Sequence, residues 1–293
     1  MKRWFTITIL VATIAMATLA CELSGVLVDN NIGKAETGSG NTVEETRPVS
    51  GVTRVELATF GTVIIDIGQN ESLRIEAEDN LLKYFDTAVQ AGTLRIKTSP
   101  SNLNLRPTKP VYYFLTVKSL KQVSIAGSGD IQVPDLETTD FGIEIGGSGD
   151  VSLADLTADW FEIDIGGSGD VTTERVDVSK FRVRINGSGD ITLGELNADE
   201  LTLNVNGSGN LRIEDGKVVD QNIDINGSGN FQAENLASKN ANIIIGGSGG
   251  ITLWVSEVLD VEVHGSGNVR YYGKPTVSSS GNGSGDITSL GDK

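Results

Sequence analysis

The stretch Gly147-Ser148-Gly149-Asp150-Val151 recurs, with small changes, nine times between residues 127 and 287. Successive Gly-Ser-Gly triplets begin 20 residues apart six times and then 18 residues apart twice. They start at positions 127, 147, 167, 187, 207, 227, 247, 265 and 283. The triplets contain half of the 36 Gly residues of the chain. A fixed period of this length predicts a repeat architecture, in which each unit packs against its neighbours.

Each unit carries two stretches in which apolar and polar residues alternate. Val151, Ser152 and Leu153 show this pattern after the triplet, and the range 161–165 shows it again before the next triplet. A period of two is typical of a β-strand with one buried face. We therefore expect two short strands joined by two turns in every unit. We expect Gly in the corner because a sharp turn needs a positive φ, which Gly adopts without steric cost.

One such unit is too small to bury its apolar face alone, but stacked units bury a continuous column. The sequence therefore predicts an all-β fold, a parallel β-helix or β-solenoid with coils of about 20 residues. Stacked strands lie about 4.8 Å apart, so nine coils give a rod of roughly 40 Å. Right-handed coiling is the expectation for parallel crossovers.

The first third of the chain also has strand-like runs, although the 20-residue period is absent there. The runs are Val52–Leu57, Thr62–Ile67, Leu73–Ala77, Thr93–Thr98 and Val111–Val117. We expect irregular coils over residues 38–126 that close the N-terminal end of the core, and regular repeats over 127–290. Residues 38–290 then form a single domain. The Ser-rich residues 278–293 are expected to cover the other end, since an open solenoid end exposes unpaired strand edges.

The N-terminus has the features of a secretion signal. Lys2 and Arg3 precede a 17-residue stretch without charges, which is the pattern of a signal peptide over residues 1–20. Thr18-Leu19-Ala20-Cys21 resembles the lipobox of bacterial lipoproteins, with Thr where that motif prefers Leu. We predict lipidation of Cys21, which is the only Cys of the chain. The alternatives are ordinary signal cleavage and an uncleaved anchor.

Composition and charge exclude several classes of protein. The net charge of −16 argues against a nucleic-acid partner, which requires a basic face. One Cys and one His exclude a disulfide framework and a zinc site built from these ligands. Anionic lipid would repel an acidic chain, so the predicted membrane attachment depends on acyl chains. Residues 21–37 are interpreted as the lipidated Cys and a tether.

Segments around the repeats resemble a known family. These segments are Gly38–Asn41, Glu45–Val52, Gly68–Glu71, Leu94–Ile96 and Leu120–Val123, followed by Gly127–Asp130. With the repeats, they make the chain similar over roughly residues 38–290 to the bacterial DUF2807 family, the head GIN domain of auto-transporter adhesins. The resemblance implies a β-helical protein that is secreted or attached to the bacterial surface, with a function in adhesion.

An acidic row follows the triplets. Four successive units place a carboxylate directly after the triplet, Asp130, Asp150, Asp170 and Asp190, and later units have Asn, Gly or Asp there. Stacked carboxylates repel one another by about 1 kcal/mol per pair even in water, and a row of Ca²⁺ ions would relieve the repulsion. The other interpretation is that Asp and Asn cap the turns with their own side chains. The replacement of Asp by Asn favours capping, so calcium is the minor alternative and no other cofactor is expected.

A second candidate site lies on the polar side of the first strand of each unit. Thr172 and Thr192 belong to a row of mostly uncharged residues, and Trp254 and Tyr272 lie near the far end of this row. Hydroxyl groups and aromatic rings are suited to bind sugars through hydrogen bonds and stacking. The alternative is a solvated sheet face without a ligand.

No residue pattern for catalysis stands out. The single His, His264, has no partner in sequence that would make a catalytic triad, and the carboxylates of the regular repeats are spread evenly. We therefore predict a non-enzymatic protein of the bacterial cell envelope, membrane-anchored or secreted. Its expected partners are the membrane, through the lipid at Cys21, and a surface glycan or envelope protein. The alternatives are a β-helix enzyme that binds or degrades polysaccharide and a passive structural or signalling module.

Overall fold

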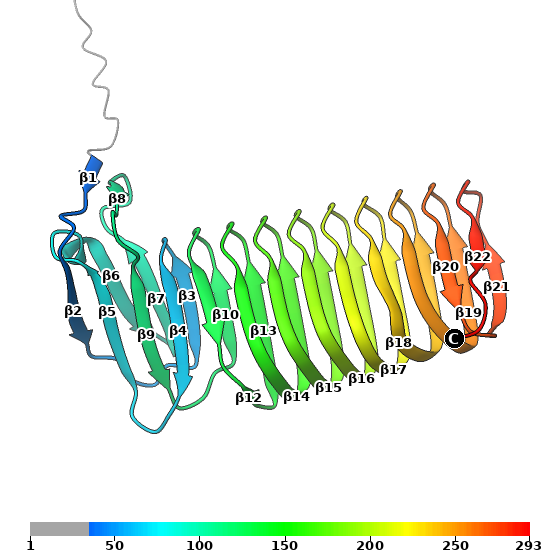
Figure 1. The fold of residues 1–293 in the computed structure, drawn as a ribbon, viewed down its shortest axis with the longest axis horizontal. Helices are drawn as coiled ribbons and strands as arrows, with labels where there is room; N and C mark the ends of the chain where they lie inside the picture. Colours follow the sequence, from blue (N-terminus) through cyan, green and yellow to red (C-terminus); the bar gives the residue numbers. More distant parts are fainter. Residues whose placement is uncertain (1–34) are drawn as a thin grey trace, which may run out of the picture.

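The computed structural model describes residues 35–293, which form an elongated rod of stacked β-coils (Figure 1). Within this range the only helical element is the short 3-10 helix η1 (Leu82–Tyr84). No helix in the described range is long and apolar enough to cross a bilayer. The predicted signal peptide, residues 1–20, and Cys21 lie outside the described residues.

Parallel pairing between successive coils builds the regular part of the rod. Val151 pairs with Val171 and Ile165 pairs with Ile185, so each strand lies beside the strand 20 residues later. The strands are β14 (Val151–Ile165), β15 (Val171–Ile185), β16 (Ile191–Val205), β17 (Leu211–Ile225), β18 (Phe231–Ile245) and β19 (Ile251–Val263). This register confirms the predicted β-solenoid.

Each regular coil contains one long strand, and the prediction of two short strands joined by two turns was wrong. Strand β14 continues around the coil, and its pairing with β15 skips only Ala154 and Asp159. Its inward-outward alternation shifts at Ala154–Asp155 and again at Asp159–Trp160, where two consecutive residues face outward. The chain bends at these two places. Pairing resumes in the same register after each bend because every coil bends at the same repeat position.

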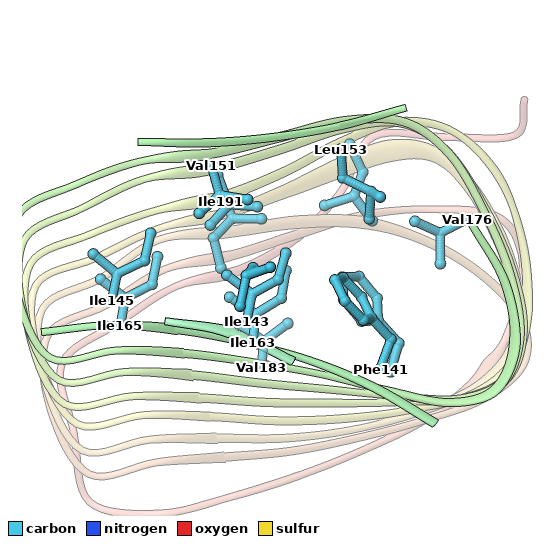
Figure 2. Packing of buried hydrophobic residues seen from close by; sticks show 14 of the residues in the cluster. Phe141, Ile143, Ile145, Val151, Leu153, Ile163, Ile165, Val176, Val183 and Ile191 are labelled. Atoms are coloured by element: carbon cyan, nitrogen blue, oxygen red, sulfur yellow. The ribbon is translucent and has the colours of Figure 1, made fainter. Parts of the chain in front are cut away.

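The core is a set of stacked apolar columns inside the coils. Figure 2 shows Val151 and Leu153 on one side of the interior, facing Ile143 and Phe141 on the other. The Phe141 and Phe161 rings stack at 5.9 Å between centroids, and Phe161 and the next ring, at position 181, stack at 5.0 Å. These side chains are at most 2% exposed. Burying each one contributes about 1.5–3 kcal/mol relative to leaving it in water.

The triplet glycines are required for a different reason than the sequence suggested. In the described residues, no triplet Gly has a positive φ. Instead, a Cβ on Gly147 would lie 1.9 Å from the carbonyl oxygen of Gly127, and one on Gly167 would lie 2.0 Å from that of Gly147. The coils approach each other too closely at this corner for any side chain. The explanation is therefore close backbone packing, and the prediction of a positive φ was wrong.

The first coil of the solenoid is formed by residues 54–67, within the N-terminal third of the chain. It consists of β3 (Arg54–Ala58) and β4 (Thr62–Ile67), and it pairs in parallel with β10 (Gln122–Ile125) and β11 (Asp130–Val133) of the next coil. That next coil then leads through β12 (Leu136–Glu137) and β13 (Asp140–Ile145) into the regular repeats.

Residues 68–121 leave the first coil and fold against its other side as a cap. The cap strands are β5 (Ser72–Glu78), β6 (Phe85–Gln90), β7 (Thr93–Thr98) and β9 (Tyr112–Val117), with β2 (Thr42–Arg47) outside them. Strands β7 and β9 continue the parallel pairing of the first coil, whereas β6, β5 and β2 pair antiparallel. The expectation of irregular coils over the whole of residues 38–126 was therefore wrong, because hairpins reverse the chain there.

The two ends of the rod differ. At the capped end, β1 (Ala35–Thr37) pairs with β8 (Asn104–Arg106), so the last three residues of the expected tether form a strand. At the other end, β20 (Val269–Tyr272), β21 (Thr276–Ser280) and β22 (Ile287–Ser289) complete the last coils. Every residue of β21 is exposed. The Ser-rich segment therefore forms the last strands, and within the described residues no further strand covers them.

Candidate functional site

One outer side of the solenoid brings the predicted ligand-binding residues into a single row. In each coil, the residue between the first two buried positions points outward and lies in register with its equivalent in the next coil. We call this row the polar face: Gln132, Ser152, Thr172, Thr192, Arg212, Gln232, Thr252 and Arg270. The row contains no carboxylate. Its side chains are all exposed or half-buried.

The Thr pair on the polar face lines an open hollow on this side. Thr172 and Thr192 are register partners, and the Thr172 hydroxyl lies 3.5 Å from the Ser152 hydroxyl. Both Thr residues line an open hollow of about 580 Å³. The structure thus places two of the four predicted residues together at a concave part of the surface.

Small residues at the first bend create this hollow, and the sequence analysis missed them. The next outward position after the polar face has Ala154 and Gly194, with Glu174 between them and Glu214 beyond. A Cβ on Gly194 would lie 2.5 Å from the Glu174 carbonyl oxygen, so backbone packing requires Gly here. The sequence did contain a signal, because small residues alternate with Glu at this repeat position: Ala154, Glu174, Gly194 and Glu214.

The aromatic pair lies in the last coils of the rod. Trp254 and Tyr272 are register partners on β19 and β20, and both are half-buried. Tyr272 lines a second hollow of about 400 Å³ together with Thr252 and Arg270. The ammonium group of Lys293 lies 4.8 Å from the centre of the Tyr272 ring. The structure therefore brings the four predicted ligand-binding residues together as two separate pairs, and it places Tyr272 beside the polar face.

Hydrogen bonds organise the middle of the polar face. The guanidinium of Arg212 donates to the side-chain oxygen of Gln232 at 3.2 Å and to the carboxylate of Glu214 at 3.2 Å. At the far end, Arg270 has no carboxylate within ion-pair distance among residues 35–293. The face thus offers amide and hydroxyl groups along most of its length and one guanidinium at its end that is available to a ligand.

The Asp row forms a ladder of hydrogen bonds between coils. The carboxylate of Asp130 accepts the backbone N–H of Asp150 at 3.0 Å, and Asp150 accepts that of Asp170 at 2.8 Å. Asp170 and Asp190 continue the ladder to the next residues of the row at 2.7 and 2.8 Å. We expected each side chain to cap its own turn, whereas each one caps the N–H of the following coil. The identical bonding by Asn at positions 210, 230 and 268 shows that the ladder needs an oxygen acceptor and not a charge.

The calcium hypothesis for this row stays a prediction. Among residues 35–293, no group of three or more His, Cys, Asp or Glu side chains is arranged to hold a metal ion. One oxygen of each Asp in the row already accepts a backbone N–H.

Two of the segments that precede the repeats hold the cap together through carboxylates. Glu71 accepts the backbone N–H groups of Gly51 and Val52, each at 2.8 Å, and these bonds outweigh desolvation and hold the pKa of Glu71 below its ordinary value. Asp79 accepts bonds from Asn41 at 2.9 Å and from Ser39 at 2.5 Å, which lower the pKa of Asp79. These contacts explain the segments Gly38–Asn41 and Gly68–Glu71 as structural.

The coils, the cap and the polar outer face define a β-solenoid repeat protein with an extended surface of polar side chains. The chain belongs to the DUF2807 family, whose description is "Putative auto-transporter adhesin, head GIN domain", and the family model matches residues 52–213 and 161–275. The comparison confirms the resemblance inferred from the opening segments and the repeats. A comparison with curated proteins finds no match.

Solved structures of similar proteins share the fold. A crystal structure of a "putative lipid binding protein" from Parabacteroides distasonis is 25% identical, with a TM-score of 0.64 over 88% of this chain and 100% of that one. A "putative adhesin" from Parabacteroides merdae is 19% identical, with a TM-score of 0.66 over 88% of this chain and 99% of that one. Another "putative adhesin", from Bacteroides fragilis, is 23% identical, with a TM-score of 0.52 over 87% and 100% of the two chains.

Proposed function

We propose that the protein is exported, anchored in the bacterial envelope by a lipid at Cys21, and acts in adhesion without catalysing a reaction. Three observations support the proposal. The chain belongs to a family described as adhesins. Its first residues have the pattern of a signal peptide followed by a lipobox-like segment. Its repeats form a long rod (Figure 1), along which polar side chains lie in register on one side.

The shape of the rod carries the proposal. Strand β1, the first described element, lies at the capped end, whereas β20, β21 and β22 lie at the opposite end (Figure 1). An anchor at Cys21 therefore attaches the rod at one end and leaves the stacked coils projecting outward. Nine coils at about 4.8 Å each extend roughly 40 Å from the cap. A rod held at one end is a suitable shape for presenting a side surface to another cell or to envelope material.

Anchoring through a lipid is consistent with the charge of the chain. The net charge of −16 opposes contact with anionic lipid headgroups, so the surface of the rod does not provide the attachment. Acyl chains on Cys21 supply the affinity instead, and stable anchoring requires more than one chain.

Labelling of cells that express the full chain tests the anchor. We expect the protein to incorporate a labelled fatty acid, to fractionate with membranes, and to be cleaved by protease added to intact cells. Cys21→Ser should lose the label and leave the membrane fraction. Ser24, three residues later, provides the matched control in Ser24→Ala, which should behave as the wild type. Equal labelling of Cys21→Ser and the wild type would contradict lipid anchoring.

Attachment of whole cells tests adhesion. Cells that display the wild type should adhere to surfaces coated with envelope glycans or host glycans more than cells that express Cys21→Ser, which should not retain the protein on their surface. Absence of any difference on every coating would contradict the adhesin proposal and favour a passive structural or signalling module. Release of reducing ends from a polysaccharide incubated with the protein would contradict the absence of catalysis.

A further inference from the structure

We propose that the polar face binds an uncharged, linear polysaccharide that lies along the axis of the solenoid and crosses successive coils. The inference rests on the proposed adhesin function and names its ligand class and its site. Four features of the polar side lead to it: the chemistry of the row, the hollow beside Thr172, the charges on the rim, and the aromatic pair at the far end.

The chemistry of the polar face matches sugar hydroxyls. Hydroxyl and amide groups such as those of Thr172, Thr192 and Gln232 both donate and accept hydrogen bonds, as sugar hydroxyls do. Register pairing places such a group on most coils, at a repeat of about 4.8 Å, with Arg212 and Arg270 as donors on the others. An extended chain of pyranose rings advances by a similar distance per sugar. One ligand chain can therefore present a hydroxyl to each coil in turn.

The hollow beside the Thr pair provides room for a ring. Its volume of about 580 Å³ lies within the range of small-ligand sites. Ala154 leaves space at the bend that a longer side chain would fill, and Gly194 packs against the backbone of Glu174 without adding a side chain to the hollow. Thr172 and Thr192 form one wall, so a ring in the hollow lies within reach of both hydroxyls.

Charges on the rim select against anionic glycans. Glu174 and Glu214 line the first hollow, and Glu234 lines the second. Carboxylates accept strong hydrogen bonds from sugar hydroxyls but repel uronate, sulfate and phosphate groups. The net charge of −16 adds repulsion at longer range. These charges favour an uncharged polysaccharide.

The aromatic end provides a stacking surface. Trp254 and Tyr272 lie side by side in register and remain half-exposed. The apolar faces of pyranose rings pack on such rings, and their hydroxyls can accept hydrogen bonds from Arg270, which lines the same hollow as Tyr272.

The other broad side of the coil differs in its early coils, where charged side chains pair with one another. Arg184 contacts Asp164 at 3.1 Å and Glu162 at 2.5 Å. Thr202 lies on that side, in the same coil as Thr192, and its hydroxyl lies 3.4 Å from Glu200. Thr202 therefore provides a control of the same residue type in the same coil.

The proposed site is tested by measuring the binding of the purified full chain, kept soluble in detergent, to a panel of ligands. The panel consists of uncharged polysaccharides (glucans, mannans and xylans), acidic polysaccharides, and vesicles of neutral and of anionic lipid. We expect saturable binding to at least one uncharged polysaccharide. The double variant Thr172→Ala/Thr192→Ala and the variant Trp254→Ala should each bind at least tenfold more weakly. Thr202→Ala should bind as the wild type.

A variant that fills the hollow separates loss of the binding site from loss of folding. Ala154→Tyr occupies the space without removing a core side chain, and it should also bind at least tenfold more weakly with an unchanged far-UV spectrum. Unchanged binding by the folded variants would overturn the inference, as would binding only to acidic polysaccharide, binding only to vesicles, or no binding to the panel.

Cell attachment separates this inference from the proposed function. If cells that display the polar-face variants adhere as well as the wild type, the site is wrong and the adhesin function stands. If wild-type cells fail to adhere while the purified protein binds an uncharged polysaccharide through these residues, the site stands and the adhesin function fails.

Discussion

The carboxylate of Glu78 accepts hydrogen bonds from both the backbone N–H and the side-chain hydroxyl of Thr108, at 2.8 and 2.5 Å. Gly40 donates to the same carboxylate at 2.6 Å. Glu78 is fully buried in the cap. One carboxylate therefore joins the segment before β2, the end of β5 and the loop before β9.

We predict that Glu78 makes the cap sensitive to acid. Burial raises the pKa of Glu78, but the hydrogen bonds from Thr108, Gly40 and Lys109 together outweigh burial and hold the pKa below its ordinary value of 4.5. The folded-state pKa is thus depressed, so the stabilisation is fully present above about pH 4.5 and is lost as the pH falls through the folded-state value. Glu78→Gln should lower the Tm at pH 7 and flatten its dependence on pH below 5.

The matched control for this prediction is Asp66→Asn, which neutralises an exposed carboxylate on β4. Thermal unfolding followed by circular dichroism between pH 3 and pH 7 measures both variants. If Glu78→Gln and Asp66→Asn have the same Tm profile, Glu78 does not hold the cap together.

Because the coils pack closely at the Gly-Ser-Gly corner, we predict that substitutions of neighbouring residues there differ sharply in their effect on the unfolding free energy. In Gly167→Ala the new Cβ would lie 2.0 Å from the carbonyl oxygen of Gly147, so the coils must separate. Overpacking of this kind typically costs about 1–3 kcal/mol of unfolding free energy, and more where backbone must move. Ser168→Ala changes the exposed residue next to it and should stay within about 0.5 kcal/mol of the wild type. Similar midpoints for both variants in urea would contradict the packing explanation.

The period of the sequence was sufficient to predict the repeats but not the cap. Alternating residues located β5 and β7 within a residue or two, and a fixed 20-residue register placed Thr172 beside Thr192. Alternation shows which side chains are buried but not whether neighbouring strands run parallel or antiparallel. The hairpins of the cap were therefore missed, together with β6, in which only Phe85 is buried.

The hollow of the candidate site also lay beyond the sequence pattern. Its walls depend on the bend at Ala154–Asp155, where the alternation shifts by one residue. The predicted unit of two short strands and two turns contained no bend within a strand. Hence Ala154 and Gly194 were not recognised as part of a site, whereas Trp254 and Tyr272 stood out by residue type alone.

One buried polar residue predicts a stabilising substitution. Gln221 is 1% exposed, lies in register between Leu201 and Ala241 in a core column, and has no partner for its side-chain nitrogen or oxygen among the described residues. Burying an unpartnered polar group costs about 1–3 kcal/mol. Gln221→Leu should raise the unfolding free energy by that amount. Gln90→Leu, at an exposed position on β6, should not, and a loss of stability in Gln221→Leu would show that Gln221 is satisfied in solution.

The ladder between coils predicts that Asn can replace Asp in the acidic row. The carboxylate of Asp170 accepts the N–H of Asp190 at 2.7 Å, and an amide oxygen can accept the same bond. Asp170→Asn also removes repulsion of about 1 kcal/mol per neighbouring carboxylate in water. This variant should therefore match or exceed the wild type in unfolding free energy. Asp170→Ala removes the acceptor and should lose about 0.5–1.5 kcal/mol.

The effect of calcium on the Tm distinguishes the two interpretations of the Asp row, hydrogen bonding between coils and metal binding. If the four carboxylates from Asp130 to Asp190 only bond to the next coil, the Tm should be the same with calcium and with a chelator, because their role needs no cation. If they bind calcium, the ion should raise the Tm of the wild type, because a ligand of the folded state stabilises it. Asp170→Asn should then lose that increase, since it removes charge from the middle of the row. We expect no effect of calcium on either protein, and a rise in the Tm of the wild type alone would establish the metal site.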